Sequence, residues 1–352
     1  MMNDRKEKIK NLTLEELKQK ISDLGEPAFR ATQVTDWLYK KRAASFSDMS
    51  NVSKGLRELL EHDFDISSLR LVKEQRSRGG TRKLLFELFD DDTIESVLIP
   101  GKGDRMTLCV SSQAGCALGC TFCLTGHNGY RRNLTSGEMI DQVIEAEHLL
   151  PPDTRITNIV FMGMGEPFLN FVQLTRALRI ITSPDALGFS PRRITVSTSG
   201  IVDRIPDFAE LGLAGLAVSL NAMDNETRTS IMPVNKKHPL NKLITACLSY
   251  WTKTNDRVTF EYVLLGGVND SSDHARKLCG LLSKIPCKIN LIPFNECEGL
   301  KFNSPKPEAV KEFSDILEEK GYITLVRQGR GEDISAACGQ LGGRSVGKEE
   351  EK

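Results

Sequence analysis

The order of elements after residue 101 limits the fold more than any other feature of the chain. Apolar runs typical of strands alternate with amphipathic helical stretches from residue 102 to residue 331. This alternation predicts parallel strands joined by right-handed crossovers. Six such units are too few to close an eight-stranded barrel, so we expect an α/β fold with a partial (βα)6 barrel that is open on one side. The predicted strands are 106–111, 158–162, 193–197, 215–220, 258–264 and 288–292, with a further strand at 323–326.

The first part of the chain has a helical pattern instead. Thr13 and Glu16 have the spacing of a capping box, and apolar residues follow them at helical intervals. Two further periodic runs follow before residue 61. We therefore expect a small helical accessory domain at residues 1–75.

A predicted β-hairpin at 76–101 connects this domain to the core. Its strands, 84–89 and 94–99, are separated by three consecutive aspartates, which favour a turn. Glu95 lies in the second strand, where an isolated carboxylate is ordinarily exposed to solvent. After the core at 102–331, a C-terminal segment at 332–352 contains Cys338 and ends in a charged tail at 347–352.

Composition narrows the class of protein. The chain has 352 residues with 47 basic and 47 acidic side chains, so any nucleic-acid surface must be a local patch. No apolar run approaches the roughly 18–20 residues that span a bilayer, and the charged start does not resemble a secretory signal. Nine unevenly spaced cysteines do not suggest a secreted disulfide scaffold. We expect a cytoplasmic protein with reduced thiols and no membrane association.

Three of these cysteines follow the first predicted core strand. Cys116, Cys120 and Cys123 have the spacing C-x3-C-x2-C. Three thiolates can bind three irons of a 4Fe-4S cluster and leave the fourth iron open to a ligand, whereas four-cysteine sites only transfer electrons. A zinc site is the alternative, because His127 lies four residues after Cys123.

A glycine-rich stretch at 163–167 ends the second predicted core strand. Glycines there would let a ligand approach the backbone, and the Glu166 carboxylate could bind an ammonium group. A tight turn with no ligand would also account for the glycines. The position of this stretch, at a strand end near the cysteine triad, favours a binding site for the amino group of a ligand.

The triad resembles that of the radical S-adenosylmethionine superfamily. Nearly the whole chain, from residue 25 to residue 341, is similar to one family within it, the RlmN/Cfr family of RNA methyltransferases. The strings that carry this resemblance occur in the same order: Cys-Val-Ser-Ser-Gln at 109–113, Arg-Arg-Asn-Leu at 131–134, Met-Gly-Met-Gly-Glu-Pro at 162–167, Ser-Thr-Ser-Gly at 197–200 and Ala-Ala-Cys-Gly-Gln-Leu at 336–341.

The resemblance implies a cofactor site and three catalytic residues. Cys116, Cys120 and Cys123 would hold the 4Fe-4S cluster. Cys338 would carry a methyl group as S-methylcysteine, Glu95 would accept a proton, and Cys109 would form a transient disulfide with Cys338. Relatives commonly have His where this chain has Asn221, but Asn also donates and accepts hydrogen bonds. The residues implied to bind S-adenosylmethionine are Gly165, Glu166, Ser197, Ser219, Leu220, Asn221 and Asn295.

The implied reaction consumes two molecules of S-adenosylmethionine per turnover. The first would methylate Cys338, and the second would give a 5'-deoxyadenosyl radical that takes a hydrogen atom from the S-methyl group. The carbon radical would then add to C2 of adenine 2503 in 23S ribosomal RNA, and of adenine 37 in transfer RNAs. C2 of adenine is not nucleophilic, so direct methyl transfer from a sulfonium cannot reach it. The alternative is methylation of C8, as in Cfr. By the same resemblance, Pro167 and Ser199 favour methylation of C2.

Two other classes remain open from the residues alone. A glycyl-radical activase would share the cluster but would not need Cys338, and a zinc or iron–sulfur RNA-binding module would need no turnover. The expected partners are 23S ribosomal RNA, transfer RNA and a reducing protein such as flavodoxin or ferredoxin, and we expect a monomer. RNA contacts could come from His127, Tyr130, Arg131 and Arg132, from 192–193 and from 235–238, although polar loops of this kind are often only solvated.

Overall fold

The structure is a computed structural model that describes residues 6–297, 299–327 and 329–342. The predicted charged tail at 347–352 lies outside these residues. A ten-stranded sheet forms the body of the molecule, in the order β14-β13-β12-β11-β10-β9-β6-β5-β4-β3. Its strands are β3 (Arg70–Arg76), β4 (Arg82–Glu87), β5 (Thr93–Pro100), β6 (Met106–Cys109), β9 (Asn158–Phe161), β10 (Ile194–Thr198), β11 (Gly215–Ser219), β12 (Val258–Leu264), β13 (Cys287–Pro293) and β14 (Ile323–Val326).

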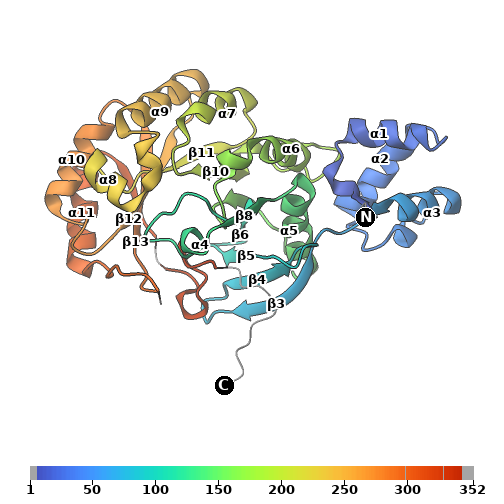
Figure 1. Cartoon of the computed structure of the whole chain (residues 1–352), viewed down its shortest axis with the longest axis horizontal. Helices are drawn as coiled ribbons and strands as arrows, with labels where there is room; N and C mark the ends of the chain where they lie inside the picture. The colour runs from blue at the N-terminus through green and yellow to red at the C-terminus, as the bar shows by residue number, and fades with distance from the viewer. Residues whose placement is uncertain (1–5, 298, 328, 343–352) are drawn as a thin grey trace.

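Seven strands of this sheet, β6 and β9–β14, are parallel, as the alternating pattern predicted. Strands β3 and β14 are the two edges of the sheet, so the barrel is open. The helices that connect the parallel strands form an arc around them in Figure 1. They are α5 (Ser136–His148), α6 (Phe171–Thr182), α7 (Ile205–Leu211), α8 (Asn225–Ile231), α9 (Leu240–Thr254), α10 (Ser272–Leu282) and α11 (Pro307–Glu319).

Buried apolar side chains of the strands and helices form one continuous core. It includes Phe161 on β9, Val218 on β11 and Phe260 on β12, each completely buried. The central strands β11 and β12 are mostly buried and accordingly mostly apolar, whereas the edge strand β14 is largely exposed. None of the described helices has the length and apolar character that a membrane span requires.

The N-terminal helices lie at one end of the molecule, beside α5 (Figure 1). The predicted capping box of Thr13 and Glu16 begins α1, and Glu16 also forms an ion pair of 2.6 Å with Arg176 on α6. Lys10 and Asp141 form a buried ion pair between this region and α5. These helices are α1 (Leu14–Asp23), α2 (Arg30–Thr35) and α3 (Lys54–Asp63).

The sheet begins earlier than we predicted. Residues 70–75, which we placed in the helical domain, belong to β3, which pairs antiparallel with β4. The predicted hairpin, β4 and β5, is also not a separate connection, because β5 pairs antiparallel with β6 of the core. The sequence of β3, Arg-Leu-Val-Lys-Glu-Gln-Arg, is mostly polar because this edge strand is largely solvent-accessible, so its pattern did not distinguish it from a polar connection.

Candidate active site

A cavity lies at the carboxyl ends of the parallel strands, where active sites of βα barrels are found. The ends of β9 to β13 form its walls, and the cysteine loop and the C-terminal segment also contribute. Its lining includes Cys116, Cys120, Cys123, Phe161, Gly163, Gly165, Glu166, Ser197, Thr198, Ser199, Ser219, Asn221, Met232, Glu261, Val263, Ile292, Phe294, Cys338 and Gly339.

The cysteine loop begins directly after β7 (Gln113–Gly115), and its backbone is tied to neighbouring segments. The Cys116 amide donates to the Gly129 carbonyl at 2.9 Å, and the Thr121 amide donates to the Ile231 carbonyl at 3.0 Å. Gly115 has φ +75°, and a Cβ there would lie 1.9 Å from the Gly129 oxygen. Only glycine therefore allows the loop to close, which fixes the three cysteines around the cavity.

The three thiols act on one another electrostatically. The pKa of Cys116 is raised to about 12, mainly by burial; a backbone hydrogen bond with Leu118 opposes the shift, and the charges of Cys123 and Glu166 add to it. Burial also raises the pKa of Cys120, and the charges of Cys123 and Cys116 add to this increase. Three converging thiolates need a compensating positive charge, which an iron–sulfur cluster supplies, so the donor set fits that cofactor.

A single zinc ion fits the arrangement less well. Among the described residues, no group of three or more His, Cys, Asp or Glu side chains is placed to hold one metal ion. The His127 ring, the candidate fourth ligand, instead makes a 3.0 Å hydrogen bond with the Thr121 carbonyl.

Glu166 is fixed at the end of β9. It is 2% exposed, and its carboxylate accepts hydrogen bonds from the amides of Ser199 at 2.7 Å and Phe168 at 3.0 Å. Burial raises its pKa, and these hydrogen bonds oppose the shift. Gly165 has φ +95°, and a Cβ at this position would lie only 2.4 Å from the Gln113 side chain, so the backbone here packs too closely for any other residue. The two residues therefore present a rigid carboxylate and an exposed stretch of backbone to the cavity.

The other residues expected to bind S-adenosylmethionine are only partly brought together. Ser197, Ser219 and Asn221 line the cavity with Gly165 and Glu166. Asn221 adopts a left-handed conformation (φ +58°), which Asn tolerates better than most residues, and its Oδ1 accepts from the Val263 amide at 2.8 Å.

Leu220 and Asn295 are not part of the cavity lining. Leu220 is completely buried, and its amide donates to the Glu261 carbonyl at 2.9 Å. Asn295 is half-buried and follows Phe294, which does line the cavity. Any contact that Leu220 makes with a ligand in this conformation would therefore be indirect.

Cys338 lies in the cavity with the triad. Its side chain is exposed to the cavity. Its pKa is raised to about 11, chiefly because the surrounding protein removes water from the charged form of the thiol. After burial, the charge of Glu261 has the largest effect and also raises the pKa. The charge of Arg327 lowers it, and the charge of Cys123 raises it by less than Glu261 does. A thiol with this pKa is mostly neutral at neutral pH.

Cys109 ends β6 and is 8% exposed. Burial raises its pKa first, and the charge of Cys338 adds to the shift. This one-sided influence is expected, because the thiol with the lower pKa, Cys338, ionises first and then opposes ionisation of its neighbour. The two cysteines are both free, and they are near enough for one charge to affect the other.

The C-terminal segment is hydrogen-bonded to the helix that follows the triad, α4 (Leu124–His127). The Leu124 amide donates to the Gly339 carbonyl at 2.8 Å, and the Thr125 hydroxyl donates to the Leu341 carbonyl at 2.6 Å. These bonds place Cys338 beside the cluster ligands, although more than 200 residues separate them in the sequence.

Glu95 is buried rather than exposed, with 7% of its surface accessible. One carboxylate oxygen is 3.2 Å from Lys83 Nζ, and the other accepts from the Gly342 amide at 2.8 Å. Lys83 Nζ also donates to the Ser335 carbonyl at 3.2 Å. Glu95 does not line the cavity, so in this conformation it contacts the C-terminal segment that carries Cys338.

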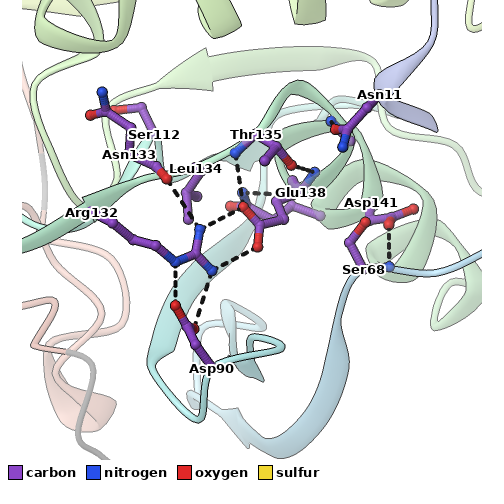
Figure 2. A network of polar contacts seen from close by, with 12 residues as sticks. Asn11, Ser68, Asp90, Ser112, Arg132, Asn133, Leu134, Thr135, Glu138 and Asp141 are labelled. Carbon is purple, nitrogen blue, oxygen red and sulfur yellow. Dashed lines mark hydrogen bonds and ion pairs between the residues drawn. The ribbon is translucent and has the colours of Figure 1, made fainter. Parts of the chain in front are cut away.

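A network of charges supports the strand that follows the triad, β8 (Tyr130–Asn133). Figure 2 shows the Arg132 guanidinium between the carboxylates of Asp90 and Glu138. Glu138 is 1% exposed and also completes the capping box of α5 with Thr135.

These contacts correct one expectation about RNA binding. Arg132 is committed to two carboxylates, so it supports β8 and is not free to contact phosphate. Two members of the polar stretch at 235–238, Asn235 and His238, are also buried, at 2% and 4% exposure. Tyr130 and Arg131 are exposed and remain candidates.

Sequence reasoning missed three residues near the cavity. Arg228 is completely buried on α8, although Glu226-Thr227-Arg228 resembles a solvated helix start. Glu261 lies within the apolar strand β12, where a carboxylate flanked by aromatic residues is an unusual feature that could have been noticed. Nothing in the sequence around Lys83 indicated a role near the site, because its role depends on its contact with Glu95.

An open parallel sheet with a C-x3-C-x2-C triad at its carboxyl edge defines a radical S-adenosylmethionine protein. Residues 110–279 match the Radical SAM superfamily, and residues 8–66 match the family described as the ribosomal RNA large subunit methyltransferase N-terminal domain. The chain belongs to the RlmN family.

Relatives of nearly the same length support this assignment. The chain is 48% identical over 339 residues to the dual-specificity RNA methyltransferase RlmN of Geotalea uraniireducens, covering 96% of each protein. It is also 48% identical to RlmN of Desulfosudis oleivorans, covering 95% of this chain and 90% of that protein. A crystal structure of a radical SAM methyltransferase from Sphaerobacter thermophilus has 43% identity and a TM-score of 0.92, covering 95% of this chain and 99% of that one.

Proposed function

We propose that the protein methylates C2 of adenine in RNA through S-methylcysteine at position 338. The substrates would be adenine 2503 of 23S ribosomal RNA and adenine 37 of transfer RNAs. The observation that carries this proposal is the presence of the Cys338 thiol in the same cavity as the cysteine triad. The RlmN name of full-length relatives supports an RNA substrate.

Each group of residues would have a separate task. Cys116, Cys120 and Cys123 would hold the 4Fe-4S cluster, and the fixed carboxylate of Glu166 would bind the ammonium group of S-adenosylmethionine. Ser197, Ser219 and Asn221 would complete that site. When bound, the two cofactors would supply the radical chemistry that makes a carbon–hydrogen bond of a methyl group reactive.

Cys338 would bring that methyl group to the adenine. Its Sγ would attack the methyl carbon of a first S-adenosylmethionine, forming a thioether and releasing S-adenosylhomocysteine, and the thiol proton would pass to solvent. Because the pKa of this thiol is about 11, the proton must leave before or during the transfer. After the methyl carbon bonds to C2, the adenine is attached covalently to the protein.

Release of the product would require Glu95 and Cys109. The radical adduct would first give up one electron, for which the cluster would be the acceptor. Glu95 would take the proton from C2. Cys109, as a thiolate, would attack the sulfur of Cys338 and leave a disulfide, while the released methylene carbon would take up a proton and become the methyl group. The disulfide would then need two electrons from the external reductant. Glu95 now contacts Gly342, so the C-terminal segment would have to move before an adenine could reach the carboxylate.

The reaction would need further partners. An external reductant such as flavodoxin or ferredoxin would supply the electron, and the target adenine would have to leave its base stack to enter the cavity. We propose that the protein acts as a monomer in the cytoplasm.

The direct test is anaerobic incubation of the reconstituted protein with S-adenosylmethionine carrying a deuterated methyl group, a reductant and ribosomal or transfer RNA. Nucleoside mass spectrometry should find 2-methyladenosine, with 5'-deoxyadenosine as the other product. A Cys338→Ala variant should make no methyladenosine, and a Cys279→Ala variant, altered in α10, should behave like the unmodified protein. Finding 8-methyladenosine would indicate the Cfr-type reaction, and finding neither nucleoside would refute methyltransferase activity.

A further inference from the structure

Arg228 is a buried cation beneath the floor of the cavity. Its side chain on α8 is completely buried. Its guanidinium donates to the carbonyls of Ser199 at 2.7 Å, Ser219 at 3.1 Å and Leu220 at 3.0 Å. It also donates to Asn235 Oδ1 at 3.1 Å. Since Ser199 and Ser219 line the cavity, the guanidinium lies directly behind the strand ends that form its wall.

The four acceptors are all uncharged. Of the residues that the structure describes, no carboxylate forms an ion pair with Arg228, in contrast to buried Lys10, which pairs with Asp141. Removing a charge from water is unfavourable, and neutral carbonyls compensate for this only in part. A buried guanidinium without an anion therefore indicates that a negative charge is supplied by something else.

The hydrogen bonds of α8 identify where that charge would be. The carbonyl of Ile231, the last residue of α8, accepts from the amide of Thr121 at 3.0 Å, so the helix that carries Arg228 lies against the triad loop beside Cys120. Burial lowers the pKa of Arg228 to about 10, and the charges of Cys120 and Cys247 oppose this shift. Cys247 is itself buried with a pKa of about 12, so it remains a neutral thiol at neutral pH. Cys120 is a member of the triad, and ligation to iron would make it a thiolate.

A cluster bound by three thiolates is negatively charged, and reduction adds one more negative charge. With the cubane at 2+ and three thiolates, the net charge is −1 when oxidised and −2 when reduced. The reduction potential of such a cluster depends on the charges, hydrogen bonds and solvent exposure around it. A nearby fixed cation stabilises the reduced form more than the oxidised form.

We propose that Arg228 is the counter-ion of the iron–sulfur cluster and makes the cluster easier to reduce. This inference rests on the proposed cluster at the triad, but not on the identity of the RNA or of the methylated carbon. Arg228 is a positioning residue: it does not bind iron, and it also holds the ends of β10 and β11 together through the Ser199 and Ser219 carbonyls.

The test is a reductive titration of the anaerobically reconstituted protein without S-adenosylmethionine, followed by electron paramagnetic resonance of the reduced cluster. In Arg228→Met, the ratio of reduced to oxidised cluster at a fixed potential should fall at least tenfold, equivalent to 59 mV for one electron. Arg228→Lys, which keeps the charge, should remain within threefold of the unmodified protein. Lys10→Met removes a buried cation on the far side of α5 and should leave the potential unchanged.

A second variant covers the possibility that Arg228→Met does not assemble a cluster. Asn235→Asp keeps Arg228 and places a carboxylate against its Nη1 atom, so the ratio should again fall. An unchanged potential in Asn235→Asp or in a fully loaded Arg228→Met would overturn the inference, as would equal shifts in Arg228→Met and Arg228→Lys. A protein with the expected potentials that makes no methyladenosine would contradict the proposed function and leave this inference intact.

Discussion

The reactivity of Cys338 should depend on two charged side chains of opposite effect. Glu261 raises the pKa of this thiol and Arg327 lowers it, with Glu261 the stronger of the two. Replacing Glu261 by Gln should therefore lower the pKa, whereas replacing Arg327 by Gln should raise it. The opposite directions distinguish an electrostatic effect from general loosening of the cavity, which would increase the reactivity of Cys338 in both variants.

The size of the expected change in the alkylation rate of Cys338 follows from the charges around the thiol. With a pKa of about 11, only about one Cys338 in 10,000 is ionised at pH 7. At an effective dielectric constant of about 20, one unit charge within about a nanometre of another contributes on the order of 2 kcal/mol, which corresponds to about 1.5 pKa units. Since a thiolate becomes less nucleophilic as its pKa falls, the alkylation rate should rise about sixfold in Glu261→Gln rather than in full proportion to ionisation.

The assay is alkylation of the cluster-free protein by iodoacetamide between pH 7 and pH 9, followed by mass spectrometry of the peptide that contains Cys338. The peptide containing Cys279 provides an internal reference rate. In the unmodified protein, the rate should still be rising at pH 9, because the thiol is far from fully ionised. A rate that levels off below pH 8, or a slower rate in Glu261→Gln, would refute the electrostatic account of this thiol.

Three further variants test other parts of the site. Gly165→Ala adds a Cβ that would clash with Gln113 at a residue with φ +95°. Calorimetry should therefore show at least tenfold weaker binding of S-adenosylmethionine, with the iron content unchanged. Unaltered affinity would argue against this strand end as the cofactor site. Arg132→Gln leaves the buried carboxylate of Glu138 without its cation and should lower the free energy of unfolding by about 3 kcal/mol in a denaturant titration, and a change below 1 kcal/mol would mean that the network is not stabilising. Cys109→Ala should trap RNA covalently on Cys338, visible as a slower band on a denaturing gel, and normal turnover of this variant would exclude the proposed release step.

Features encoded by local patterns were predictable from the sequence. The parallel strands β6 and β9–β14 were found within one or two residues, because each is a short apolar run bounded by polar turns. The cysteine triad, Gly165 and Glu166 were predicted at the ends of parallel strands, and these residues line one cavity in the structure. Parallel topology brings strand ends together wherever they lie in the sequence, so such positions can be inferred without coordinates.

Features that depend on a distant partner were not predictable. Arg132 was a candidate for RNA contact, but it pairs with Asp90, 42 residues earlier in the chain. Arg228 resembled a solvated helical residue, and its burial depends on carbonyls of two different strand ends. Glu95 was expected at the strand surface by its type alone, and only the docking of the C-terminal segment through Gly342 makes it buried. In each case the partner, rather than the residue, determines the environment.

The most direct measurement for the whole account is the mass of the peptide that contains Cys338, taken from protein that has been produced with an intact cluster and isolated anaerobically. The account predicts a mass increase of one methyl group on Cys338, and loss of this group when RNA and reductant are supplied. An unmodified Cys338 in cluster-replete protein, or a methyl group that stays on the sulfur while the RNA becomes methylated, would contradict it.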